Sequence, residues 1–198
     1  MRLAAVLFLL PLPALADLSA PIQAALNTCL AKGPSLADRA AALTAAGWQP
    51  LPLADRSAAA QAFAPLELFR IGRLSEEDTL DRRAELLVQA ATGTRWQIDQ
   101  EHGSEIWLST PAGEGFLTVR SRIADIVDCQ IAADLLPDQI AAALSAPIER
   151  QDHPPVTLTY FITGKTRLDS PVLMTFAPNA FGGLPILPIL TTPSVAAN

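Results

Sequence analysis

The first half of the chain repeats its apolar residues at the spacing of an α-helix. The first such series stops before Gly33-Pro34 and consists of Leu18, Ile22, Leu26, Cys29 and Leu30. Ser35 and Asp38 then carry the pattern of a capping box, and Gly47 is placed to end the helix that follows. The spacing therefore predicts two helices that form a hairpin.

Two further helical segments are predicted beyond this hairpin. The connector at residues 48–53 contains two prolines, so it is an extended segment or at most an edge strand. A third helical region runs from Asp55 toward Phe69 and is interrupted by Pro65. A fourth helix is predicted from an N-cap at Ser75 to Gly93. Its apolar face consists of Leu80, Ala84, Leu87, Val88 and Ala91.

Beyond Gly93 the apolar residues alternate as they do in β-strands. Strands are predicted at residues 95–100, 105–110, 115–121 and 126–133, joined by turns as an antiparallel meander. A short helix at residues 137–144 follows, and two more strands are predicted at 156–163 and 171–177. From Pro178 onward, the spacing of prolines and glycines predicts an extended tail outside the sheet.

These elements predict an α+β fold in which N-terminal helices pack on an antiparallel sheet of five or six strands. Residues 17–177 are expected to form a single domain, helical over 18–93 and mostly strand over 95–177. The Pro/Gly-rich tail at 178–198 is expected to be dispensable for folding and available for a partner.

The first 16 residues have the order of a secretory signal peptide. A basic start at Arg2 precedes a short apolar run, and small residues at Ala14 and Ala16 suit the peptidase, so cleavage is expected after Ala16. The alternative, an apolar first helix of the fold, must accommodate Pro11 and Pro13. No later segment has the uninterrupted apolar length of a membrane span, and position 17 lacks the cysteine of a lipid anchor.

The charge of the chain argues against anionic partners. The formal net charge is −6, and removal of residues 1–16 takes away Arg2 and no acidic residue, which leaves −7. Nucleic acid and anionic lipid both attract a positive field, so neither is expected as a partner. The signal peptide and the arginine- and alanine-rich composition favour the periplasm of a Gram-negative bacterium.

Several polar motifs are candidates for chemistry. Gly164-Lys165-Thr166 follows a predicted strand, but Thr159 stands where a phosphate-binding loop requires glycine, so a hairpin turn explains it better. Metal or acid/base chemistry at His102 or His153 would need further convergent ligands, and both histidines are expected in loops. The acidic run at 76–78 fits a helix start. Asp125 and Asp128 are expected on opposite strand faces, so they do not form a carboxylate pair.

Two functional hypotheses remain, and neither requires a cofactor or a metal. The chain lacks Gly-x-Ser-x-Gly and Ser-x-x-Lys motifs, which favours a non-catalytic periplasmic binding or interaction protein. Its partner would be another periplasmic or envelope protein, held through the C-terminal tail or a sheet edge. The alternative is a hydrolase-type enzyme that uses His102 or His153 with a distant group. Trp48, Trp96 and Trp107 are expected in the core.

The two cysteines are predicted to form a disulfide. Cys29 lies on the apolar face of the first helix, and alternation places Cys129 on the same strand face as Val127 and Ile131. Both side chains are therefore expected at the contact between helix and sheet. Exported chains pass through an oxidising compartment, where such a pair is usually joined.

Overall fold

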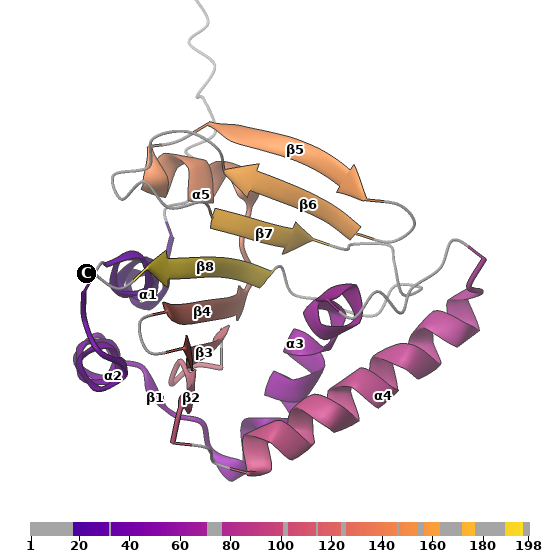
Figure 1. The fold of residues 1–198 in the computed structure, drawn as a ribbon, viewed down its shortest axis with the longest axis horizontal. Helices are drawn as coiled ribbons and strands as arrows, with labels where there is room; N and C mark the ends of the chain where they lie inside the picture. Colours follow the sequence, from indigo (N-terminus) through magenta and orange to yellow (C-terminus); the bar gives the residue numbers. More distant parts are fainter. Residues whose placement is uncertain are drawn as a thin grey trace, which may run out of the picture.

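A computed structural model describes most of the chain outside its first 17 residues (Figure 1). The described residues are 18–31, 33–70, 77–100, 103–113, 115–123, 126–145, 147–153, 157–162, 172–176 and 189–195. The predicted signal peptide, residues 1–16, lies outside them. No helix in these ranges is long and apolar enough to cross a membrane.

Five α-helices and one short 3-10 helix are present in the described residues. They are α1 (Ala20–Leu30), α2 (Leu36–Ala45), η1 (Leu53–Asp55), α3 (Arg56–Arg70), α4 (Leu80–Asp99) and α5 (Pro137–Leu144). The predicted capping box is confirmed, because the Ser35 hydroxyl accepts from the Asp38 amide while the Asp38 carboxylate accepts from the Ser35 amide. Gly47 follows α2 with a φ of +95°, a conformation that glycine adopts without strain. The structure thus bears out the first helical hairpin.

Helix α3 is continuous through Pro65, and α4 ends later than the sequence pattern indicates. Pro65 was expected to interrupt α3, but the helix continues through it because apolar side chains on both sides, such as Phe63 and Leu66, are buried. The strand predicted at 95–100 is wrong, since α4 runs on through Gly93 to Asp99. The buried residues of α4 explain this, because Leu86, Thr94 and Ile98 lie on one helical face.

The strands form one antiparallel sheet. They are β1 (Gln49–Pro50), β2 (Glu105–Ser109), β3 (Gly115–Ile123), β4 (Ile126–Ala133), β5 (Ile148–His153), β6 (Thr157–Ile162), β7 (Val172–Phe176) and β8 (Ile189–Val195). Their order is β1-β2-β3-β4-β8-β7-β6-β5, and the first four follow one another as a meander. The α+β class is confirmed, whereas the prediction of five or six strands is wrong. The additional strands are β1, which lies in the connector expected to be extended or an edge strand, and β5 and β8, which the apolar pattern did not indicate, while the strand predicted at 95–100 is replaced by helix.

Strand β8 corrects the prediction of a tail over residues 189–195. It lies between β4 and β7, and Ile189 is buried. Pro193 faces Asp128 of β4, while β7 pairs only with residues 189–191. Within the described part of the chain, Pro193 therefore has a paired strand on the β4 side only, which a residue without an amide hydrogen tolerates. Residues 178–188 and 196–198 lie outside the described residues.

The sheet carries helices on both faces (Figure 1). Odd-numbered residues of β3 and β4, such as Leu117 and Ile131, belong to a core shared with α1, α2 and α5. Even-numbered residues, Phe116 and Ala132, belong to a second core with α3 and Ile98 of α4. Successive side chains of a strand point to opposite faces, so the α1–α2 hairpin and the α3–α4 hairpin lie on opposite sides of the sheet.

Candidate functional site

The predicted histidine chemistry falls largely outside the described residues. His102 lies in the gap at residues 101–102, and the segment Gly164-Lys165-Thr166 lies in the gap at 163–171. His153 was expected in a loop, but it is the last residue of the edge strand β5. Only its backbone is described. The hydrolase hypothesis therefore stays a prediction.

The acidic run at 76–78 was predicted to start a helix, but α4 begins after it, and the acidic residue in the first turn of α4 is Asp81. Ser75 and Glu76 lie outside the described residues, and the N-cap of α4 is Thr79, whose hydroxyl accepts from the Arg82 amide at 3.2 Å. Asp125 also lies in a gap, while Asp128 is buried in β4. Within the described ranges, no three His, Cys, Asp or Glu side chains gather as metal ligands would.

Cys29 of α1 and Cys129 of β4 lie at disulfide-bonding distance, with their Cα atoms 5.7 Å apart. Cys129 shares its strand face with Val127 and Ile131, as the alternation predicted. The contact joins the helical half of the chain to the sheet half across a sequence separation of 100 residues. This arrangement fits an oxidising compartment.

A buried arginine that the sequence analysis missed holds the end of α1. Arg39 of α2 is only 1% exposed, and its guanidinium donates to the carbonyl oxygens of Thr28, Cys29, Ala31 and Pro34. These carbonyls include the ends that a helix C-terminus leaves without amide partners, and the positive charge suits the helix dipole there. Burial lowers the pKa of this guanidinium. Arg39 thus fixes the turn of chain that carries Cys29.

A polar row crosses the sheet on the face of the α3–α4 hairpin. Glu105 of β2, Arg120 of β3 and Asp128 of β4 face one another in successive strand pairs. The Glu105 carboxylate accepts from Arg120 at 2.6 and 2.8 Å and from the Thr118 hydroxyl at 3.1 Å. This row alternates two carboxylates with one guanidinium across three strands.

Two cavities are lined by residues in the described part of the chain. One, of about 300 Å³, lies where α1, β4 and α5 meet and has Ser19, Asp134 and Gln139 among its lining residues. The other, of about 250 Å³, lies between α3 and α4 and is lined by Glu67, Leu68, Leu86, Gln89, Ala90, Gly93, Thr94 and Gln97. Among the described residues, neither lining contains a histidine or a cysteine.

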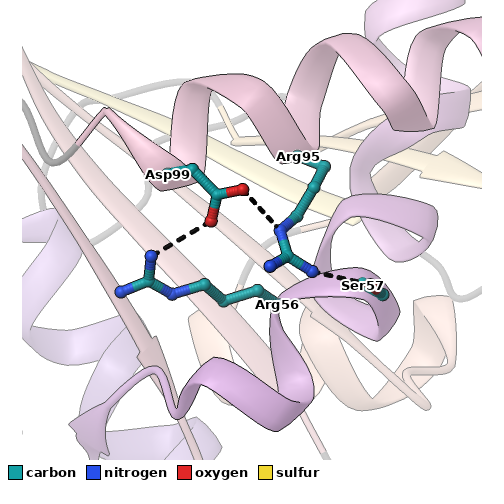
Figure 2. Close-up of polar contacts among 4 residues, drawn as sticks. All are labelled: Arg56, Ser57, Arg95 and Asp99. Atoms are coloured by element: carbon teal, nitrogen blue, oxygen red, sulfur yellow. Dashed lines mark hydrogen bonds and ion pairs between the residues drawn. The ribbon is translucent and has the colours of Figure 1, made fainter.

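An ion-pair cluster joins the start of α3 to the end of α4 (Figure 2). The Asp99 carboxylate accepts from Arg95 at 2.9 Å and from Arg56 at 3.1 Å, and Arg95 also donates to the Ser57 hydroxyl at 2.7 Å. The hydrogen bonds from Arg95, and next those from Arg56, hold the pKa of Asp99 below its ordinary value. We define these four residues as the helix clamp. It fixes the last turn of α4 against α3.

The outer face of α4 exposes large apolar side chains. Val88 and Trp96 are 66% and 62% exposed, respectively. Val88 and Trp96 are two helical turns apart and therefore lie on the same side of the helix. All three tryptophans were expected in the core, and the exposed Trp96 corrects that expectation. Trp48 is fully buried, and Trp107 packs edge-on against Phe63. We define Val88 and Trp96 as the α4 outer face.

No protein-family model, curated protein or solved structure matches this chain. Its function is therefore argued from its own residues. The sequence analysis missed both the helix clamp and the α4 outer face. The four-residue spacing of Arg95 and Asp99 was the signal that would have indicated a helical ion pair there.

Proposed function

We propose that this chain is an exported, non-catalytic interaction protein of the periplasm that binds another envelope protein through the α4 outer face. The exposure of Trp96 carries the proposal. A tryptophan exposed to 62% on a rigid helix presents an apolar area that folding leaves in water. Tryptophan is also the residue type that most often dominates the energy of a protein interface.

The helix clamp supports this role because it immobilises the turn that carries Trp96. Arg95 and Asp99 flank Trp96 in the sequence, and both are tied to the first turn of α3. A surface that is rigid before binding loses less conformational entropy when a partner docks. The proposed mode is a helical face set into an apolar groove of the partner.

Export rests on the predicted signal peptide and on the cysteine pair. We propose that the mature chain begins at Asp17 and folds where Cys29 and Cys129 are oxidised. The intact mass of the protein recovered from a periplasmic fraction tests both points. A species that retains Met1, or one with two free thiols, would contradict them.

Site-specific photo-crosslinking in living cells tests the interaction. A photoreactive residue at Val88 or Trp96 is expected to give a discrete adduct with a different protein. The same residue at Ala41, which is exposed on α2, is the matched control and is expected to give none. An identical adduct pattern at all three positions, or adducts only between copies of this chain, would refute binding of a partner through α4.

A further inference from the structure

The two edges of the sheet differ in how they are protected. One edge is β1, which has two residues and ends in Pro50, a residue without an amide hydrogen. The opposite edge is β5, which has six residues (Figure 1). Among the described residues, no strand pairs with β5 on the side away from β6. An edge of this length offers a row of main-chain donors and acceptors to another strand.

The charges along β5 are complementary to themselves in one antiparallel register. The strand reads Ile-Glu-Arg-Gln-Asp-His from residue 148 to residue 153. If Gln151 faces Gln151 of a second copy, Arg150 faces Asp152 of that copy, and Glu149 faces His153. The two-fold axis repeats each pair, so this register contains four favourable cross-strand pairs.

Neighbouring registers lose this complementarity. A shift that centres the axis between Arg150 and Gln151 places Glu149 opposite Asp152, which is repulsive. Axes on Arg150 or on Asp152 place like charges directly opposite each other. An axis between Glu149 and Arg150, or between Asp152 and His153, keeps two complementary pairs, so the register about Gln151, with four, has the most.

We infer that β5 is a self-association edge, where two copies of this chain pair in antiparallel fashion about Gln151. Main-chain hydrogen bonds between the two β5 strands hold the pair, and the charged pairs set its register. This inference does not depend on the α4 outer face, because β5 and α4 are separate elements of the fold.

Charge exchange tests the inference on the mature, oxidised chain. Arg150→Asp places a carboxylate opposite Asp152, and Asp152→Arg places a guanidinium opposite Arg150, so each variant repels its own copies. We expect at least about tenfold weaker self-association for each variant in sedimentation equilibrium. An equimolar mixture of the two variants makes every such pair complementary, and a heterodimer is expected. Failure of the mixture to associate would overturn the inference, and so would a wild type that stays monomeric at high concentration.

Cysteine crosslinking provides a second test that keeps the charges. Gln151→Cys places two thiols on the axis, where facing Cα atoms of paired strands are about 4.5 to 5.5 Å apart and a disulfide is allowed. A covalent dimer is expected on oxidation. His153→Cys is the matched control, because its facing residue is Glu149, and it is expected to stay uncrosslinked. Equal crosslinking of both variants, or of neither, would refute the register.

Discussion

The two helical hairpins lie on opposite faces of one sheet and are held there by different interactions. In the α1–α2 hairpin, Cys29 lies against Cys129 of β4 at bonding distance, and the buried Arg39 binds four backbone carbonyls. Trp48, which follows this hairpin, is fully buried and donates to the Pro21 carbonyl at 2.9 Å. The side chains of Arg39 and Trp48 thus donate hydrogen bonds to backbone carbonyls of the same region.

The α3–α4 hairpin combines a buried inner side with an exposed outer one. Phe63 and Ile98 pack in the core against the sheet, while Val88 and Trp96 remain exposed. The helix clamp lies at the surface, where ion pairs contribute little to stability. The difference indicates that the first hairpin serves stability and the second presents a surface. The predictions below test this division from the largest expected effect to the smallest.

Removal of β8 is expected to destroy both regions. A chain that ends at residue 188 lacks the strand between β4 and β7, and with it Ile189, which packs in the core on the α3 side. Helix α1 also contacts β8. We expect no cooperative thermal transition by circular dichroism. Deletion of residues 196–198 alone is the control and should leave the transition in place. A cooperative transition in the shorter chain would restore the idea of a dispensable tail.

Loss of the cysteine pair is expected to weaken the α1–α2 side selectively. For a loop of 100 residues, Cys29→Ala with Cys129→Ala should lower the free energy of unfolding by about 2 to 5 kcal/mol. Denaturant unfolding measures the loss, and hydrogen exchange locates it. Amides of α1 should lose more protection than those of α4. Reduction of the wild type should give the same result, and an unchanged midpoint after reduction would mean that the bond does not form.

The sequence predicted the cysteine pair but not β8, and the reason is the range of the interactions. The positions of Cys29 and Cys129 follow from local periodicity, which places each on an apolar face. Strand β8 is a strand because β4 and β7 pair with it, while its own residues include Pro193 and few apolar side chains. Pairing partners distant in sequence therefore decided that these residues form a strand.

Residues 95–100 show why the candidate site was missed. Trp96 and Ile98 alternate with polar residues, which suits a strand, and Gly93 suggested a helix end. The competing helical pattern joins Leu86, Thr94 and Ile98, and it prevailed because that face packs on α3. The exposure of Trp96 depends on which side of α4 is covered by α3, so the pattern of α4 alone does not determine it.

Replacement of Arg39 is expected to destabilise the fold more than replacement of an arginine on α4. Arg39→Met keeps most of the side-chain volume but leaves buried carbonyls without donors, so the free energy of unfolding should fall by about 2 to 4 kcal/mol. Arg82→Met on α4 is the matched control, because Arg82 is half-exposed and pairs only with Glu85 among the contacts seen for its side chain. It should change stability by about 0.5 kcal/mol or less. Equal effects of the two substitutions would contradict the proposed division.

The smallest expected effect compares two exposed carboxylates, Asp38 of the capping box and Asp99 of the helix clamp. Bonds from Ser35 lower the pKa of Asp38, and bonds from Arg95 and Arg56 lower that of Asp99, each from an ordinary value of 3.8. A lowered pKa means that the folded state prefers the charged form. The stabilisation is therefore complete above the ordinary value and is lost as the pH falls through the lowered pKa.

Carboxyl-carbon NMR titration is expected to find both pKa values below 3.8 and to separate them by their response to salt. Asp99 owes its shift to charged partners, so 1 M NaCl should move its pKa upward. Asp38 owes its shift to hydrogen bonds with uncharged groups of Ser35, so its pKa should move less.

Asp99→Asn should also loosen the last turn of α4 and weaken the photo-adduct at Trp96, whereas Asp38→Asn should leave that adduct unchanged. If Asp99→Asn leaves both the exchange of the last α4 amides and the adduct unchanged, the helix clamp does not prepare the α4 outer face for binding.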